Sequence, residues 1–439
     1  MEWLAIAQKY KYEAVFGRIN YNWEDKYLIN LTGRRDGSSR FGSGKQFGNF
    51  GAIGAAWIFS NENFIQKNFD FLSFGKIRGS YGTTGNDGIP DYQYLDLYSV
   101  TYTPYGGIHG LSPTNLANPS LVWEIDKKLE GGLELGFLKD RIFITANYFR
   151  NRSGNQLVVT PVSFVTGFNS IQENLPALVQ NSGTEWTLKT INVKSKNFNW
   201  SSSINLTIAR NKLISFPNLA NSTYSNTLVI GQPINILKLY HSLGVNDTTG
   251  IYQFASSQGA PTYTPDPIKD VTSFVNRTPK YYGGFQNSLR YKRITLDFFF
   301  QFVKQIGQNL LGAYYSLPGG ESNMPVAFLN RWQKPGDKAI YQQFSQTFSY
   351  ASPVYQALQY AHRSDFAYSD ASYIRLKNIA ISWQLPDEFR NKLGLQNARI
   401  YLQAQNLFTI THYQGIDPES QGLGLPPLRV VTAGIQITL

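Results

Sequence analysis

The sequence predicts an all-β protein whose fold is a transmembrane antiparallel β-barrel, and three observations support this prediction. Segments of roughly ten residues alternate apolar and polar side chains along most of the chain, as barrel strands do. Very short charged turns and much longer connections separate these segments in alternation. The chain contains no apolar run of roughly 18 residues, the length that a spanning helix needs. Any membrane crossing must therefore be made by strands that close on themselves.

The alternation is clearest in the segment 294–302. Ile294, Leu296, Phe298, Phe300 and Phe302 fall on one side, whereas Thr295, Asp297 and Gln301 fall on the other. Successive side chains of a strand point to opposite faces, so a period of two predicts one apolar and one polar face. We expect the apolar set to face lipid and the polar set to face the barrel lumen.

The same pattern places the other strands. We predict strands near 12–23, 27–35, 47–59, 72–84, 127–138, 141–152, 183–194, 198–210, 280–291, 293–305, 371–385, 397–411 and 428–439. Tight turns follow at 24–26, 139–141, 195–197 and 292–293, and long connections span 85–126, 153–182, 211–279 and 306–370. Barrels of the outer membrane keep short turns in the periplasm and long loops outside. The strand near 12–23 then descends towards the periplasm.

This arrangement predicts about 13 strands, or 15 if the segment 211–279 contains a hairpin of the same sheet. Single-chain bacterial barrels have an even number of strands and begin in the periplasm. We therefore expect strands to be missing on the N-terminal side, which would leave the strand near 12–23 as an unpaired edge. The segment Met1–Tyr10 has no signal-peptide pattern, so we expect this chain to be a piece of a longer exported protein.

Composition agrees with a membrane barrel and excludes several other classes. Of the 439 residues 15% are aromatic and only 16% are charged, which suits a lipid-facing wall with interfacial aromatic girdles. The net charge is +11, but the basic residues are scattered rather than clustered. That favours anionic lipid headgroups or solutes over nucleic acid as the attracted partner. The absence of cysteine excludes disulfides and thiolate metal sites.

Short motifs in order along the chain resemble the SusC/RagA family of TonB-linked outer-membrane transporters. Together they are more specific than any one of them is alone. They are Val15–Tyr21, Arg34–Gly42, Gly54–Trp57, Lys76–Asn86, Leu116–Glu124, Val179–Glu185, Tyr373–Asn378, Ala404–Thr409 and Gly415–Glu419.

The resemblance implies a 22-stranded barrel, of which residues 1–439 would be the C-terminal part with about 13–15 strands. The plug and the N-terminal domains would be absent from this chain. It further implies import of large nutrients, oligosaccharides or peptides, together with a SusD-like surface lipoprotein and with TonB-ExbB-ExbD acting through the plug. Family members often carry an Asp-rich, Gly-containing loop before the strand at 280; the segment Asp266–Val275 lacks that spacing, so the resemblance does not extend to a calcium site.

Candidate substrate contacts lie in the first long connection, because tyrosines stack on sugar rings and their hydroxyls form hydrogen bonds at low entropic cost. The alternative is that these rings pack within the loop or belong to the aromatic girdle at the membrane interface. The loops 85–126 and 306–370 are expected to form the outer mouth together. The tyrosines are Tyr92, Tyr94, Tyr98, Tyr102 and Tyr105.

A second group of candidates is expected to face the lumen and to contact the plug rather than the solute. Asp417–Glu419 is interpreted as a loop turn, and Arg40 as part of a solvated loop that could alternatively contact lipopolysaccharide or substrate. The lumen-facing candidates are Arg18, Asn20, Arg34, Glu130, Asp297 and Gln301.

No enzyme, metal site or cofactor is predicted. The four histidines are isolated, and no Gly-x-Ser-x-Gly motif occurs. Two alternatives to an energised importer remain open: a passive pore or structural barrel component, and a secreted all-β glycan-binding protein. A plug and a TonB box encoded upstream would separate the first alternative from an importer, and solubility without detergent would favour the second.

Overall fold

A computed structural model describes residues 8–101, 103–314 and 316–438, so the candidate Tyr102 lies outside the described residues. The chain divides into two compact units. The first comprises Met1–Leu188 and Ala209–Ile234, and the second comprises Lys189–Ile208 and Asn235–Leu439. The hairpin of strands β9 and β10 contributes to both units. Each unit is described separately.

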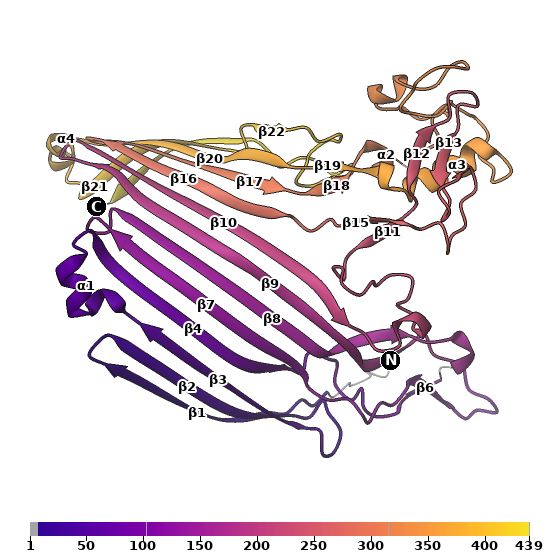
Figure 1. Ribbon diagram of the computed structural model, residues 1–439, viewed down its shortest axis with the longest axis horizontal. Coiled ribbons are helices and arrows are strands. Elements are labelled where there is room, and N and C mark those ends of the chain that lie inside the picture. Colours follow the sequence, from indigo (N-terminus) through magenta and orange to yellow (C-terminus); the bar gives the residue numbers. More distant parts are fainter. Residues whose placement is uncertain (1–7, 102, 315, 439) are drawn as a thin grey trace. The chain divides into compact units, whose positions relative to one another are not determined.

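The first unit is built on a meander of long antiparallel strands, drawn from indigo to magenta in Figure 1. Each strand pairs with the next one in the order β1-β2-β3-β4-β7-β8-β9. The helix α1 (Asn63–Asn68) lies between β3 and β4, and the small hairpin β5–β6 (Leu97–Val100 and Leu111–Asn115) lies between β4 and β7. The strands are β1 (Tyr12–Trp23), β2 (Tyr27–Ser38), β3 (Phe47–Trp57), β4 (Leu72–Asn86), β7 (Glu124–Phe137), β8 (Ile142–Pro161) and β9 (Ser170–Lys194).

The second unit continues the same antiparallel order with β10-β16-β17-β20-β21-β23, and the short β22 (Thr409–Thr411) also pairs with β20. Tight turns join β9 to β10 and β16 to β17, and the helix α4 (Asp387–Lys392) lies between β20 and β21. The strands are β10 (Phe198–Ser215), β16 (Tyr281–Tyr291), β17 (Ile294–Lys304), β20 (Tyr373–Gln384), β21 (Asn397–Gln405) and β23 (Val430–Thr438).

Every strand predicted from the sequence overlaps at least one observed strand, but one predicted long connection is wrong. The segment 153–182 is mostly the continuation of β8 and β9, which reach Pro161 and begin at Ser170. Leu175, Ala177 and Val179 of this part are buried against Leu213 and Phe216. Because the segment around 216–228 covers them, the simple apolar–polar alternation of a lipid-facing strand is lost there. The strand predicted at 397–411 is also divided, into β21 and β22.

The segment 211–279 adds no strand between β10 and β16 in the large sheet, so its hairpin alternative does not apply to that sheet. It forms instead the short strands β11 (Leu237–Leu239), β12 (Ser242–Val245), β13 (Tyr252–Ala255), β14 (Pro261–Thr262) and β15 (Ser273–Val275). With α2 (Leu310–Ala313) and α3 (Pro353–His362), these strands gather beyond the ends of β16 and β17 in Figure 1. We call this assembly the loop lobe.

The loop lobe has a core of its own. Tyr252, Phe254, Phe328, Ala357 and Leu358 are almost fully buried in it. Most of the connection 211–279, from residue 235 onward, therefore folds together with the distant connection 306–370 as one body. The expectation that 306–370 forms an outer mouth with 85–126 is not tested, because those segments belong to different units.

The cross-strand register separates a polar from an apolar face in each unit. In the first unit Asn20 pairs with Asn30, Asn30 with Gly54, and Ser80 with Glu130, whereas Ile19 pairs with Leu31. Directly opposed residues share a face, so these pairs define the polar face and the apolar face used below. Among the described residues no helix combines the length and apolar character needed to cross a membrane.

The strand β1 lies at one end of the strand order. Its one paired neighbour among the described strands is β2, and all of its twelve residues are exposed. Unpaired backbone groups along such an edge are a template for pairing with another strand.

Candidate functional site on the polar faces and the long loops

The polar face of the first unit brings together four of the predicted lumen-facing residues. Arg18 is paired with Thr32, and Asn20 with Asn30. Arg34 lies two positions after Thr32 on the same side of β2, and Glu130 reaches this face through Ser80. Alternation in four separate strands therefore produces one continuous polar surface.

Two hollows open on this surface. The larger, of about 650 Å³, is lined by side chains and small residues of β1 to β4, including Arg18, Asn20 and Arg78. The smaller, of about 290 Å³, is lined by Arg78, Glu130, Asn147 and Glu185 among others. Gly54, Gly79 and Ala52 contribute little side-chain bulk beside the larger hollow, so the charged side chains around it have room for a partner.

Most charges of this face are already paired with neighbours. The Arg34 Nε donates to both carboxylate oxygens of Asp36, at 3.0 and 2.8 Å. The Arg78 guanidinium donates to Asn147 Oδ1 at 2.7 Å and lies 3.4 Å from a carboxylate oxygen of Glu134. The Arg18 Nε donates to Asn20 Oδ1 at 3.1 Å. The polar surface is thus held in place by its own bonds before any partner contacts it.

In the second unit Asp297 and Gln301 also lie on one face, opposite Phe298. Asp297 is paired with Ser288 and Ala380, and Gln301 with Gly284 and Arg375. The apolar residues of β17 lie on the other face, where each is paired with an apolar residue of β20. The pairs are Ile294 with Trp383, Leu296 with Ile381, Phe298 with Ile379, and Phe302 with Ile374.

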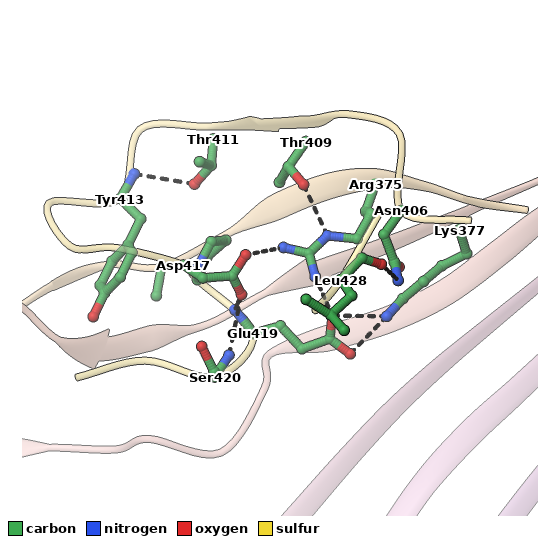
Figure 2. Close-up of polar contacts among 12 residues, drawn as sticks. Arg375, Lys377, Asn406, Thr409, Thr411, Tyr413, Asp417, Glu419, Ser420 and Leu428 are labelled. Atoms are coloured by element: carbon green, nitrogen blue, oxygen red, sulfur yellow. Dashed lines mark hydrogen bonds and ion pairs between the residues drawn. The ribbon is translucent and has the colours of Figure 1, made fainter. Parts of the chain in front are cut away.

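Beside Gln301 lies a buried charge network that Figure 2 shows in close-up. Arg375 is 2% exposed and donates from Nε to Thr409 Oγ1 at 2.8 Å. Its two terminal nitrogens donate to Glu419, at 2.5 Å, and to Asp417. Lys377 donates to both carboxylate oxygens of Glu419 at 2.7 Å. Two cations of β20 therefore hold two anions of the loop before β23.

The sequence interpretation of Asp417–Glu419 as a turn describes only half of its role. Asp417 Oδ1 accepts hydrogen bonds from the backbone N–H groups of Glu419 and Ser420, at 2.9 and 3.2 Å, as a turn residue does. Its other oxygen binds Arg375. The sequence contained one signal of this second role: the apolar–polar alternation of β20 breaks at Lys377, where the strand has a bulge opposite β17. A bulge re-aims side chains, and here both basic residues meet the loop.

The predicted tyrosines divide into packed and exposed residues. Tyr92 exchanges hydrogen bonds with the backbone of Lys9, at 2.7 and 3.1 Å, and Tyr94 packs against the buried cluster around Phe41 and Trp123. Tyr98 is 59% exposed and Tyr105 is 94% exposed. Tyr92 and Tyr94 thus have structural contacts, and only Tyr98 and Tyr105 of the described candidates present free rings.

Arg40 was expected in a solvated loop, but its side chain is partly buried and bonded to neighbouring segments. Its Nε donates to Asp91 Oδ1 at 2.8 Å, a terminal nitrogen donates to the Asp87 carbonyl, and its guanidinium lies 4.3 Å from the centre of the Tyr10 ring. Together these contacts tie the loop after β2 to the segment after β4.

Of the two histidines in the loop lobe, one is paired with a carboxylate and the other is buried. His241 Nδ1 lies 2.6 Å from Asp365 Oδ2, and the same carboxylate accepts a hydrogen bond from Ser273. His362 is 9% exposed, and this burial lowers its pKa to about 4. Within residues 8–101, 103–314 and 316–438, no group of three or more His, Cys, Asp or Glu side chains is arranged to hold a metal ion.

Comparison with known proteins places these features in a family. The model of the "TonB dependent receptor-like, beta-barrel" family matches residues 5–407. TonB-dependent receptor P3 of Formosa agariphila is 29% identical over 434 residues, which cover 93% of this chain and 42% of that protein. TonB-dependent receptor SusC of Bacteroides thetaiotaomicron is 26% identical over 447 residues, which cover 95% of this chain and 42% of SusC.

A solved structure shares the fold over nearly all of the chain. A chain of the RagAB peptide transporter superposes with a TM-score of 0.82 at 26% identity, covering 98% of this chain and 48% of that one. The chain spans less than half the length of each of these relatives.

Proposed function

Because the chain belongs to the TonB-dependent receptor β-barrel family and is of the SusC/RagA type, we propose that it serves in TonB-dependent import of large nutrients across the outer membrane. In this proposal the chain contributes the C-terminal part of a barrel of about 22 strands, and β1 pairs with a strand that precedes this segment. The fully exposed edge of β1 supports that pairing.

The observation that carries the proposal is the continuous polar face of β1 to β8. Arg18, Asn20, Arg34 and Glu130 line the lumen and contact a plug there, and Asp297 and Gln301 do so in the second unit. A plug that moves during transport must form and break its contacts with the wall, and polar contacts allow this because water can replace them. The hollows beside Arg18 and Arg78 leave room for plug side chains.

The relatives and the exposed rings support the proposed cargo class. The solved relative is a peptide transporter. Tyr98 and Tyr105 on and beside the β5–β6 hairpin offer flat rings that suit a glycan or a peptide. A SusD-like surface lipoprotein is the proposed partner at this end of the barrel, and TonB-ExbB-ExbD is the proposed source of energy.

The test is uptake of labelled oligosaccharides and peptides by cells that carry the full natural gene as their only importer of this type. We expect uptake to stop when TonB is deleted, because a passive pore would continue to admit solute. Y98A and Y105A should reduce uptake while leaving assembly intact. Y94A, which alters a packed ring, is the control for damage to the loop. Uptake that persists without TonB would contradict the proposal and favour a passive pore.

A further inference from the structure

A group of basic side chains in the first unit lies on the apolar face of the sheet instead of the polar face. Lys127 of β7 is paired with Arg152 of β8, and Leu129 is paired with Arg150. These positions alternate with Glu130 and Asn147, which belong to the polar face. Lys127, Arg150 and Arg152 therefore lie on the apolar face, where charges are expensive unless they stand at its border.

The same face carries two more cations on β10. The Arg152 Nε donates to Gln180 Oε1 at 2.9 Å, so Gln180 of β9 lies on the apolar face. Asn211 Nδ2 donates to Asn181 Oδ1 at 2.7 Å, so these two residues share the opposite face. Residues adjacent to Asn211 then point to the side of Gln180. We call the resulting set the basic rim: Lys127, Arg150, Arg152, Arg210 and Lys212.

The basic rim stands at the border of the apolar band. Lys127 lies ten positions before Phe137, the last residue of β7. At about 3.3 Å per residue and a tilt of roughly 40°, it is about 25 Å above that end, which is the height of the apolar band of a barrel. Tyr81, opposite Leu129, and Tyr148 are half-exposed at about the same level on this face. Tyrosines mark membrane interfaces.

The rim is a concentration of positive charge. In the described part of the chain Lys127, Arg150, Arg152 and Lys212 make no ion pair. The nearest acidic side chains on these strands, Asp126, Glu130 and Glu185, alternate onto the polar face. Arg210 donates to the carbonyl of Ala209.

We propose that the basic rim binds the phosphate groups of an anionic glycolipid of the outer leaflet, a lipid A-type headgroup. The apolar residues below the rim contact the acyl chains, and the guanidinium groups of Arg150 and Arg152 suit bidentate contact with phosphate oxygens. The lipid is the occupant because the cations adjoin the apolar band on the side turned away from the lumen. The inference does not depend on which nutrient the protein imports.

The experiment measures binding of fluorescent lipid A to the full natural-length protein in detergent, with enzymatically dephosphorylated lipid A as the second probe. Each basic residue near a charged lipid surface contributes roughly a fivefold gain in affinity. The variant K127Q/R150Q/R152Q should therefore bind lipid A about a hundredfold more weakly than the unaltered protein. The loss should shrink in 1 M salt, where charges are screened beyond about 3 Å.

Two matched variants separate charge from structure. K127R/R150K/R152K keeps the three charges and should retain most of the affinity. K269Q/K334Q/K338Q removes three exposed charges of the loop lobe and should bind lipid A as the unaltered protein does. If the triple rim variant fails to assemble, K127Q alone should still show about a fivefold loss.

Three results would overturn the proposal. The first is equal binding of lipid A by the unaltered protein and by the assembled rim variants. The second is equal affinity of the unaltered protein for phosphorylated and dephosphorylated lipid A. The third is displacement of lipid A by inorganic pyrophosphate at comparable concentration, which would make the rim a site for free phosphate instead of a lipid headgroup.

Discussion

The buried network around Arg375 allows a quantitative prediction. We consider Arg375→Met, which keeps a long side chain in the site and removes the cation. In the unaltered protein two cations face two anions, because Arg375 and Lys377 bind Asp417 and Glu419. The substitution leaves one cation for two carboxylates, and Asp417 is only 5% exposed.

The magnitude follows from what remains bonded. Asp417 would retain the two backbone N–H donors of Glu419 and Ser420, and Glu419 would retain Lys377. Removing one partner of a buried ion pair costs about 3–5 kcal/mol, so Arg375→Met should lower the free energy of unfolding by about that amount. Asp417→Asn removes one charge but keeps an acceptor oxygen, and it should cost about 1.5–3 kcal/mol.

The assay is urea unfolding of the protein in lipid vesicles, followed by tryptophan fluorescence and by the heat-dependent shift in electrophoretic mobility. Limited proteolysis reports on the loop that the network anchors, between β21 and β23. Cleavage within 406–429 should become faster in Arg375→Met, because the two carboxylates no longer attach the loop to β20.

The double variant Arg375→Met/Asp417→Leu completes a mutant cycle. It restores one cation for one anion, since Lys377 and Glu419 remain, and it should therefore be more stable than Arg375→Met alone. The reasoning would be refuted if Arg375→Met cost less than about 1 kcal/mol, or if the two substitutions were additive, because the network would then behave like an exposed pair.

Three further predictions concern other parts of the molecule. Phe298→Arg on the apolar face should cost roughly 2–4 kcal/mol near the membrane midplane, whereas Phe299→Arg, on the polar face, should cost less; equal costs in urea unfolding would contradict the assigned faces. Gly283→Ala should impair assembly, scored by the heat-dependent mobility shift, because a Cβ there would lie 2.0 Å from the Asn205 carbonyl oxygen; normal assembly would count against this close approach. The pKa of His362 falls from 6.5 to about 4 on burial, so the unfolded state binds a proton first as the pH falls. The loop lobe should then lose about 3 kcal/mol between pH 6.5 and 4, measured by hydrogen exchange, and His362→Gln should remove this loss.

The strands could be predicted because their alternation is a local property. A lipid-facing strand must place apolar side chains at every second position, and the backbone allows no other spacing. The ends of β8 and β9 were not predicted, because these strands extend beyond the apolar band, where that constraint no longer applies. There Leu175, Ala177 and Val179 are buried by a segment more than thirty positions away in the sequence.

The face on which each candidate residue lies could be predicted for the same reason. Arg18, Asn20, Arg34, Glu130, Asp297 and Gln301 fall on polar faces because strand parity assigns them there. The roles of individual side chains were not accessible in this way. Tyr92 and Tyr98 look alike in the sequence, but Tyr92 is bonded to Lys9 and Tyr98 is exposed.

The sequence by itself determined the class of fold, the positions of the long strands and which side chains share a face, because a period of two is recorded in consecutive residues. Only the tertiary structure decided which distant segments meet. The loop lobe joins 235–279 to 306–370, the Arg375 network joins β20 to the loop before β23, and the basic rim gathers side chains of β7, β8 and β10 on one face. Such contacts depend on strand register and on burial between residues far apart in the chain, and neither leaves a periodic trace in the sequence.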